Sequence, residues 1–224
     1  MARTDLEGHA NASRRESASD GHASPPGYPS DLESDVATRL GILLHVRPIR
    51  PDDAPPLVDF HQGLSLNSVY RRFLYVHRNL SAEEVERFTC VDYVNRLALV
   101  AEDDSGLVAI ARYDRAPGTA EAEVAFVVAD QYQHHGIGTL LLERLAAAAW
   151  QRGITEFVAT ALAENREMLQ VFADSGFQVT TALAGGIMSV RFPIAPDDAY
   201  RTACQARHEH DHDQSVRSDG RGTL

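Results

Sequence analysis

The sequence contains no lysine: all 21 of its basic residues are arginine. This absence excludes a P-loop NTPase, whose phosphate loop needs a lysine directly after its second glycine. The chain has only two cysteines, too few for a disulfide framework, and no apolar run near the ~20 residues of a membrane span. The N-terminus also lacks the apolar core of a secretory signal. We therefore expect a cytoplasmic protein that does not bind a membrane.

An excess of negative charge narrows the class of partner. The 224 residues carry a net charge of −11, and the arginines are spread along the chain. A nucleic-acid-binding protein normally concentrates basic residues on one face, so we expect no nucleic-acid partner. The length and the 44% content of hydrophobic residues suit one globular domain with tails.

Composition separates two tails from this domain. Residues 1–43 are rich in Ser, Gly, Ala, Asp and Pro, and they lack periodic apolar positions. This composition predicts a disordered N-terminal tail. Residues 196–224 predict a second, acidic and His-rich tail. Its sequence HEHDHD (His208–Asp213) could hold a metal, but no rigid element fixes a ligand geometry, so we expect a solvated tail and no metal site. The domain then spans residues 44–195.

Strands and helices alternate within the domain. The patterns predict strands at 44–50, 96–103, 107–115, 120–130 and 154–162, followed by an antiparallel pair in FQVTTAL and IMSVRF. Short helices are predicted at 53–62, 65–75 and 81–89, the last with Ser81 and Glu84 as a capping box. Longer helices are predicted at 138–152 and after Asn165, which is a suitable N-cap. This order predicts an α/β domain with a mixed sheet.

A glycine loop between a strand and a helix is the clearest functional signal. Residues 133–138 read Gln-His-His-Gly-Ile-Gly and precede the apolar helix. The free N–H groups of a helix's first turn bind anions, and phosphate is a common ligand. A dinucleotide fingerprint would need a third glycine where Leu141 stands. A tight turn without a ligand remains the alternative.

The loop and its surroundings resemble the Gcn5-related N-acetyltransferases (GNAT). In that family, Q/R-x-x-G-x-G/A follows the fourth strand and wraps the pyrophosphate of coenzyme A. The segment ALAENREMLQVFADSGF continues the resemblance, which covers about residues 45–193. The segments LSLNSVYRRF and AEVAFVV are most similar to bacterial protein-lysine acetyltransferases that act on acetyl-CoA synthetase. The resemblance implies a mostly antiparallel, seven-stranded sheet with helices on both faces.

The resemblance also implies the residues that bind acetyl-CoA. The backbone of Phe126, Val127 and Val128 would bind the thioester and pantetheine, and Asn165 would reach the coenzyme. The pyrophosphate would lie against the N–H groups of the loop and first helical turn: Gln133, His134, His135, Gly136, Ile137, Gly138 and Thr139. Phe172 is also expected beside the coenzyme, at the position where many relatives carry a tyrosine that protonates the leaving thiolate, but a phenyl ring has no proton to give. His134 and His135 stand where relatives often have Gly, Arg or Lys.

Acetyl transfer to an amine needs a base, because the amine arrives as an ammonium ion. Glu121 and Glu123 share one face of the predicted strand. Glu123 lies deeper in the apolar run, where we expect it to be the more buried of the two, and it matches the family's catalytic glutamate. We therefore predict Glu123 as the general base and Glu121 as a surface or substrate-rim group. Tyr70, Arg71 and Arg72 fall in the helical region that borders the acceptor groove of the family, and a solvated helix face explains them equally well.

These features predict an enzyme that transfers acetyl from acetyl-CoA to an amine. The acceptor favoured by the resemblance is a lysine presented by a protein substrate. Acetylation of a small amine remains an alternative, because the same core serves both acceptors. Non-catalytic sensing of acyl-CoA is a second alternative, against which the presence of Glu123 argues. The sequence does not determine the oligomeric state.

Overall fold

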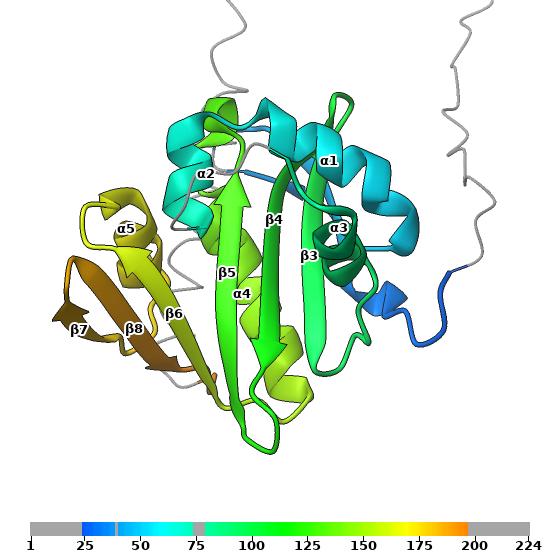
Figure 1. Cartoon of the computed structure of the whole chain (residues 1–224). Coiled ribbons are helices and arrows are strands. Elements are labelled where there is room, and N and C mark those ends of the chain that lie inside the picture. The colour runs from blue at the N-terminus through cyan, green and yellow to red at the C-terminus, as the bar shows by residue number, and fades with distance from the viewer. Residues whose placement is uncertain (1–23, 39, 74–78, 197–224) are drawn as a thin grey trace, which may run out of the picture.

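One mixed sheet organises the domain (Figure 1), in the strand order β1-β2-β3-β4-β5-β6-β8-β7. The computed structural model describes residues 24–38, 40–73 and 79–196. The only parallel pair among the described strands is β5–β6, and all other neighbours are antiparallel. The strands are β1 (Ser34–Ala37), β2 (Leu43–Pro48), β3 (Arg96–Asp103), β4 (Gly106–Arg115), β5 (Glu121–Val128), β6 (Glu156–Leu162), β7 (Thr180–Ala184) and β8 (Ile187–Pro193).

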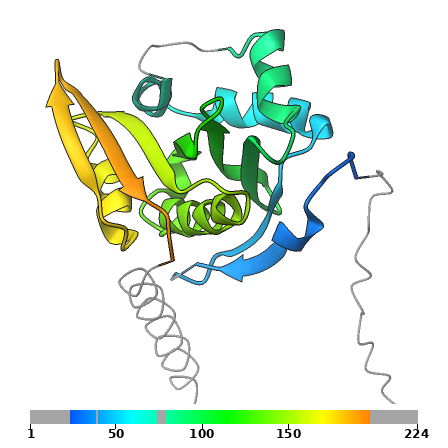
Figure 2. The ribbon, with the colours of Figure 1, turned by 90° about the horizontal axis from the view of Figure 1, so that it is seen from below.

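Helices cover both faces of this sheet. Figure 2 shows α4 on one face, with α1 and α3 on the opposite face. The α-helices are α1 (Ala54–Gly63), α2 (Leu66–Phe73), α3 (Ala82–Thr89), α4 (Ile137–Gln151) and α5 (Arg166–Asp174). Short 3-10 turns are η1 (Ser30–Leu32), η2 (Pro51–Asp53) and η3 (Asp130–Tyr132). The predicted α/β class, with a mixed sheet that has helices on both faces, is confirmed.

Local sequence signals explain where these elements begin and end. At α3, Ser81 Oγ accepts from the Glu84 N–H at 3.2 Å and Glu84 Oε2 accepts from the Ser81 N–H at 2.8 Å, which confirms the predicted capping box. Helix α4 is followed by Gly153, whose φ of +76° is a conformation that glycine adopts without steric cost. The helix predicted at 65–75 is described as far as Phe73, and its last residues lie outside the described part of the chain.

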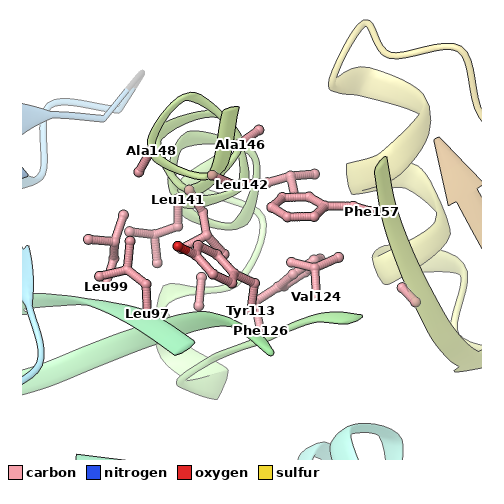
Figure 3. Packing of buried hydrophobic residues seen from close by; sticks show 14 of the residues in the cluster. Leu97, Leu99, Tyr113, Val124, Phe126, Leu141, Leu142, Ala146, Ala148 and Phe157 are labelled. Carbon is pink, nitrogen blue, oxygen red and sulfur yellow. The ribbon is translucent and has the colours of Figure 1, made fainter. Parts of the chain in front are cut away.

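The larger core lies between α4 and the sheet (Figure 3). Leucines of α4 contact the inward side chains of β3, β4 and β5, and Tyr113 and Phe157 lie fully buried among them. A second apolar cluster on the other face joins α1 and α2 to the sheet through residues such as Leu57, Val69 and Ile110. Side chains alternate across β5, so this strand contributes to both clusters. It therefore lies at the centre of the molecule.

The N-terminal boundary predicted from composition is wrong. Residues 24–38 are described, and they form η1 and an eighth strand, β1, where we expected disorder and seven strands. Tyr28 packs edge-on against Tyr93 at 5.6 Å and lies 4.6 Å beneath the Arg50 guanidinium. Glu33 also binds Arg50, at 2.5 Å. These contacts stabilise residues 24–38 in their folded conformation, although the segment itself has few hydrophobic residues to bury.

The remaining predictions about the tails are not addressed by the structure. Residues 1–23 and 197–224, including the HEHDHD sequence, lie outside the described residues. Within residues 24–38, 40–73 and 79–196, no helix has the length and hydrophobicity that crossing a membrane requires.

Candidate active site

The site begins where two neighbouring strands separate. Strands β5 and β6 pair only from Glu121 to Glu123, which lie opposite Glu156 to Val158. Beyond Glu123 the two strands diverge toward the end of the sheet where α2 lies (Figure 1). The edge of β5 that faces β6 therefore loses its strand partner over its last residues. An unpaired strand edge presents N–H and C=O groups that an extended ligand can bind.

A large pocket occupies this opening. Its volume is about 910 Å³, enough for an extended cofactor. The walls come from the end of β5, the loop before α4, the first turns of α4 and α5, α2, and the turn between β1 and β2. Its lining includes nearly all of the predicted coenzyme residues, namely Phe126, Val127, Val128, Gln133, His134, His135, Gly136, Ile137, Gly138, Thr139 and Asn165.

The backbone of β5 offers two residues to this pocket. At the end of the strand, the Ala129 N–H donates to the Val108 carbonyl at 2.9 Å. Because hydrogen-bonded residues alternate in an antiparallel pair, Val127 also pairs with β4, whereas Phe126 and Val128 direct their N–H and C=O groups toward β6. The backbone of Val127 is thus engaged with Ile110 of β4 and, unlike the backbones of Phe126 and Val128, is not directed toward the opening, although Val127 is among the residues that line the pocket.

The loop before α4 places free N–H groups at one wall of the pocket. Gly136 is the N-cap of α4 with φ +78°, and the first helical bond runs from the Leu140 N–H to the Gly136 carbonyl. The N–H groups of Ile137, Gly138 and Thr139 therefore have no partner within the helix, and the helix dipole makes this end attractive to an anion.

The two glycines of the loop are needed for different reasons. Gly136 adopts a left-handed conformation, with open space where a Cβ would stand. Gly138 has an ordinary helical backbone, but a Cβ there would lie 3.3 Å from Val171 Cγ2 and 3.5 Å from Phe126 Cε2. The first glycine allows the turn, and the second allows α4 to approach α5 and β5 closely.

Histidines 134 and 135 shape the loop. His134 has φ +64°, which is uncommon for a residue with a side chain. His135 Nδ1 lies 2.6 Å from the Gln133 carbonyl oxygen and donates to it. That bond leaves Nε2 as the nitrogen that can face a ligand. Both histidines line the pocket, whereas the sequence left a role as exposed bystanders open.

Asn165 is both a helix cap and part of the pocket wall. Its Oδ1 accepts from the Met168 N–H at 3.2 Å at the start of α5, and the residue is 6% exposed. The predicted N-cap is confirmed. The side chain also lines the pocket.

Phe172 lies elsewhere than predicted. It is only 1% exposed, packs against Phe126 and Phe192 with ring centroids 5.7 and 5.5 Å away, and is not part of the pocket lining. Because α5 turns this position into the core, Val171 and Met168 line the pocket instead. A phenyl ring at this position therefore contributes packing.

The relative burial of the two glutamates is the reverse of the prediction. Glu123 is exposed, and Glu121 is half-buried. Glu121 accepts a hydrogen bond from Arg191 at 2.6 Å, and Arg191 also binds Glu156. Glu123 is the last residue of β5 that pairs with β6, so it lies where the two strands begin to separate. Glu121 is held in an ion pair, which leaves Glu123 as the better placed of the two to accept a proton.

The three α2 residues differ in their surroundings. Arg71 binds Glu167 of α5 at 2.5 Å, so this ion pair joins two walls of the pocket. Arg72 lines the same pocket, whereas Tyr70 is 37% exposed and does not. The alternative of a solvated helix face therefore fits Tyr70 better than the two arginines.

Sequence reasoning missed two parts of the site. The turn between β1 and β2 contributes Ala37, Thr38 and Leu40 to the pocket, and α2 contributes Ser68. The four-residue strand β1 has no clear apolar alternation, so no pattern marked it. The hydroxyl of Ser68 is placed by its contact with Asp130, which is 62 residues away in the sequence.

Comparison with known proteins identifies this arrangement. A model of the acetyltransferase (GNAT) domain matches residues 44–178. The chain belongs to the GNAT acetyltransferase family. The assignment made from the loop sequence is confirmed, and the geometry described above is that of a GNAT N-acetyltransferase.

Individual relatives agree with this assignment. The chain is 32% identical to the acetyltransferase Pat of Mycolicibacterium smegmatis over 61% of this chain and 41% of the relative, so it spans less than half of that protein. The GNAT domain of S. lividans PAT is 40% identical with a TM-score of 0.70, covering 74% of this chain and 99% of that domain. A cAMP-binding acyltransferase from Mycobacterium smegmatis is 26% identical with a TM-score of 0.53, covering 86% of this chain and 58% of that protein. The resemblance of this GNAT domain to bacterial Pat acetyltransferases is therefore confirmed.

Proposed function

We propose that this GNAT enzyme transfers acetyl from acetyl-CoA to the ε-amine of a lysine in a protein substrate. The observation that carries the proposal is one pocket that contains both the free edge of β5 and the free N–H groups of α4. An extended amide chain ending in a pyrophosphate suits these two features, since the amides can extend the sheet edge and the pyrophosphate can bind the helix terminus. The scarcity of cysteine favours the cytoplasm as the compartment.

Five changes balance the proposed reaction. The ammonium of the acceptor loses a proton to Glu123, directly or through a water. The amine nitrogen then attacks the thioester carbonyl carbon, a C–N bond forms, the C–S bond breaks, and the nitrogen gives up a second proton to solvent to become the amide. An N–H of Phe126 or Val128 would stabilise the developing negative charge on the carbonyl oxygen. The departing thiolate would take a proton from solvent, because the buried Phe172 has none to give.

The choice of a protein acceptor is supported by the relatives and not by the pocket. Two of them carry the name Pat, and one is named an acyltransferase that binds cAMP. The S. lividans domain, at 40% identity over nearly its whole length, is the strongest of these supports. These names support our proposal that the acceptor is a lysine of another protein.

A thiol-release assay tests the proposal. Purified protein is incubated with acetyl-CoA and either acetyl-CoA synthetase or a panel of polyamines and amino acids, and free thiol and acetylated product are both measured. We expect acetylated lysine on the synthetase. Acetylation of a small amine alone would replace the protein acceptor, and tight binding of acetyl-CoA without thiol release in any arm would indicate a sensor.

A further inference from the structure

A polar network connects the acceptor-side helix α2 to the loop before α4. Its centre is the carboxylate of Asp130, the first residue of η3. Asp130 accepts from the Ser65 N–H at 2.9 Å, from the Ser65 hydroxyl at 2.6 Å and from the Ser68 hydroxyl at 2.9 Å. The first turn of α2 is therefore attached to η3 by three hydrogen bonds to a single side chain.

The network continues from Ser68 to the first residue of the loop. Gln133 Nε2 lies 3.2 Å from Ser68 Oγ and 3.1 Å from the carbonyl oxygen of Val128. Ser68 is 7% exposed and lines the pocket. The chain of contacts therefore runs from α2 through Ser68 and Gln133 to the last residue of β5.

The donor and acceptor groups of Gln133, Ser68 and Asp130 allow only one direction for the hydrogen bonds that join them. An ionised carboxylate only accepts hydrogen bonds, and a hydroxyl has a single proton to give. Because Ser68 donates that proton to Asp130, its oxygen must accept from the amide of Gln133. The Gln133 NH2 group is then directed at two acceptors, Ser68 Oγ and the Val128 carbonyl, and the opposite amide orientation would place two acceptors against each other.

The ionised form of Asp130 is the stable one in the folded protein. Burial acts to raise the pKa of this carboxyl, but the hydrogen bonds from Ser65 and Ser68 outweigh burial and hold the pKa below its usual value. The direction of the network is therefore maintained at neutral pH.

We propose that Ser68, oriented by Asp130, is a positioning residue that sets the Gln133 side chain and thereby couples α2 to the coenzyme loop. This inference rests on the proposed coenzyme site. Fixing Gln133 fixes the distance between the loop and the Val128 end of β5, the two features that would bind the pyrophosphate and the pantetheine. Preorganising a site in this way lowers the cost of ordering it when the ligand binds.

Replacing either of the two serines that bind Asp130 by alanine gives a matched pair of variants, whose affinities for acetyl-CoA can be compared. Ser68→Ala and Ser65→Ala each remove one hydroxyl bond to the same carboxylate, but only Ser68 continues to Gln133. We expect Ser68→Ala to raise the Kd for acetyl-CoA roughly five- to tenfold, the usual worth of one or two hydrogen bonds. Ser65→Ala should change this Kd less than twofold, although both variants lower Tm.

A double-mutant cycle separates positioning from direct contact, because Ser68 also lines the pocket. If Ser68 acts through Gln133, then in a Gln133→Ala background Ser68→Ala should add less than a twofold loss of acetyl-CoA affinity. The full five- to tenfold loss in both backgrounds would mean that Ser68 contacts the coenzyme itself and would overturn the inference, as would equal effects of Ser68→Ala and Ser65→Ala. Failure of the unmodified protein to bind acetyl-CoA would instead reject the proposed function.

Discussion

Glu123 of β5 lies opposite Val158 of β6 in the last paired position before the two strands separate. This relationship puts the candidate base where the opening between the strands begins, and the backbones of Phe126 and Val128, which point toward β6, lie farther along the opening. The Val128 carbonyl already accepts from Gln133, so the N–H groups of the two residues and the Phe126 carbonyl remain for a ligand. The geometry therefore makes Glu123, more than any other acidic residue of β5, the group to test first.

Glu123→Gln should separate catalysis from binding. The amide keeps the size of the side chain but cannot accept a proton at neutral pH, so kcat should fall about 10²–10⁴-fold, the usual contribution of a positioned base. The loss should be smaller at high pH, where more of a lysine acceptor, with an ordinary pKa of about 10.4, is already neutral. Acetyl-CoA affinity, measured by calorimetry, should stay within a few-fold.

Glu121→Gln is the control for that experiment. Glu121 lies two residues away on the same face but is bound to Arg191, so its loss should affect kcat far less. Near-normal turnover of Glu123→Gln at pH 7 would remove Glu123 from the mechanism.

Gly136→Ala and Gly153→Ala should cost similar stability but differ in binding. Both glycines have φ near +77° with open space at the Cβ position, at opposite ends of α4. Each alanine should lower stability by about 1–2 kcal/mol, the usual penalty for a left-handed residue. Only Gly136→Ala should weaken acetyl-CoA binding, by tenfold or more in calorimetry. Equal binding by both variants would make the loop a structural turn only.

Removal of the N-terminal segment should destabilise the domain, contrary to what composition alone suggests. A variant without residues 1–41 loses β1, the Tyr28–Tyr93 contact and the Glu33–Arg50 ion pair. We expect its Tm to fall by about 5 °C or more, which corresponds to about 2 kcal/mol in a domain of this size. A variant without residues 1–23 is the control, and from its composition we expect an unchanged Tm in calorimetry. Identical Tm values for the two would show that β1 adds no stability.

Acid should remove the stabilising effect of Asp92. Partial burial acts to raise the pKa of this carboxyl. The carboxylate also accepts hydrogen bonds from N–H groups of Arg96, Val94 and Asn95, and these outweigh burial and hold its pKa below the usual value. A lowered pKa in the folded state stabilises the protein above the unfolded pKa of about 3.9, and the contribution disappears as pH falls through the folded pKa. The stability difference between the natural chain and Asp92→Ala, from urea unfolding, should therefore be full at pH 7 and shrink below pH 4. A difference that is constant down to pH 2.5 would contradict this account.

The absence of lysine limits what the enzyme can do to itself. Incubation with acetyl-CoA should add acetyl at most at the N-terminal amine, because no side-chain amine exists in the chain. Intact-mass spectrometry and peptide mapping test this expectation. An internal acetyl group would reveal transfer to a hydroxyl or thiol and would require a different nucleophile.

The sequence by itself determined the elements and the family. Gly136 and Gly138 between an apolar strand and an apolar helix, Ser81 with its partner three residues on, and Asn165 before its helix are local signals, because turns and caps involve residues close in the chain. These signals placed the strands and helices from 43 to 193 to within about three residues, and the family resemblance that they carry named about half of the residues that line the pocket.

Only the tertiary structure decided how these elements meet. Strand β1 pairs with β2, and Tyr28 and Glu33 before it contact Tyr93 and Arg50. Phe172 faces the core because α5 packs that way, and Ser68 contacts both Asp130 and Gln133, which are 62 and 65 residues away in the sequence. Each outcome depends on contacts between residues far apart in the sequence, and local propensity and periodicity carry no information about such contacts.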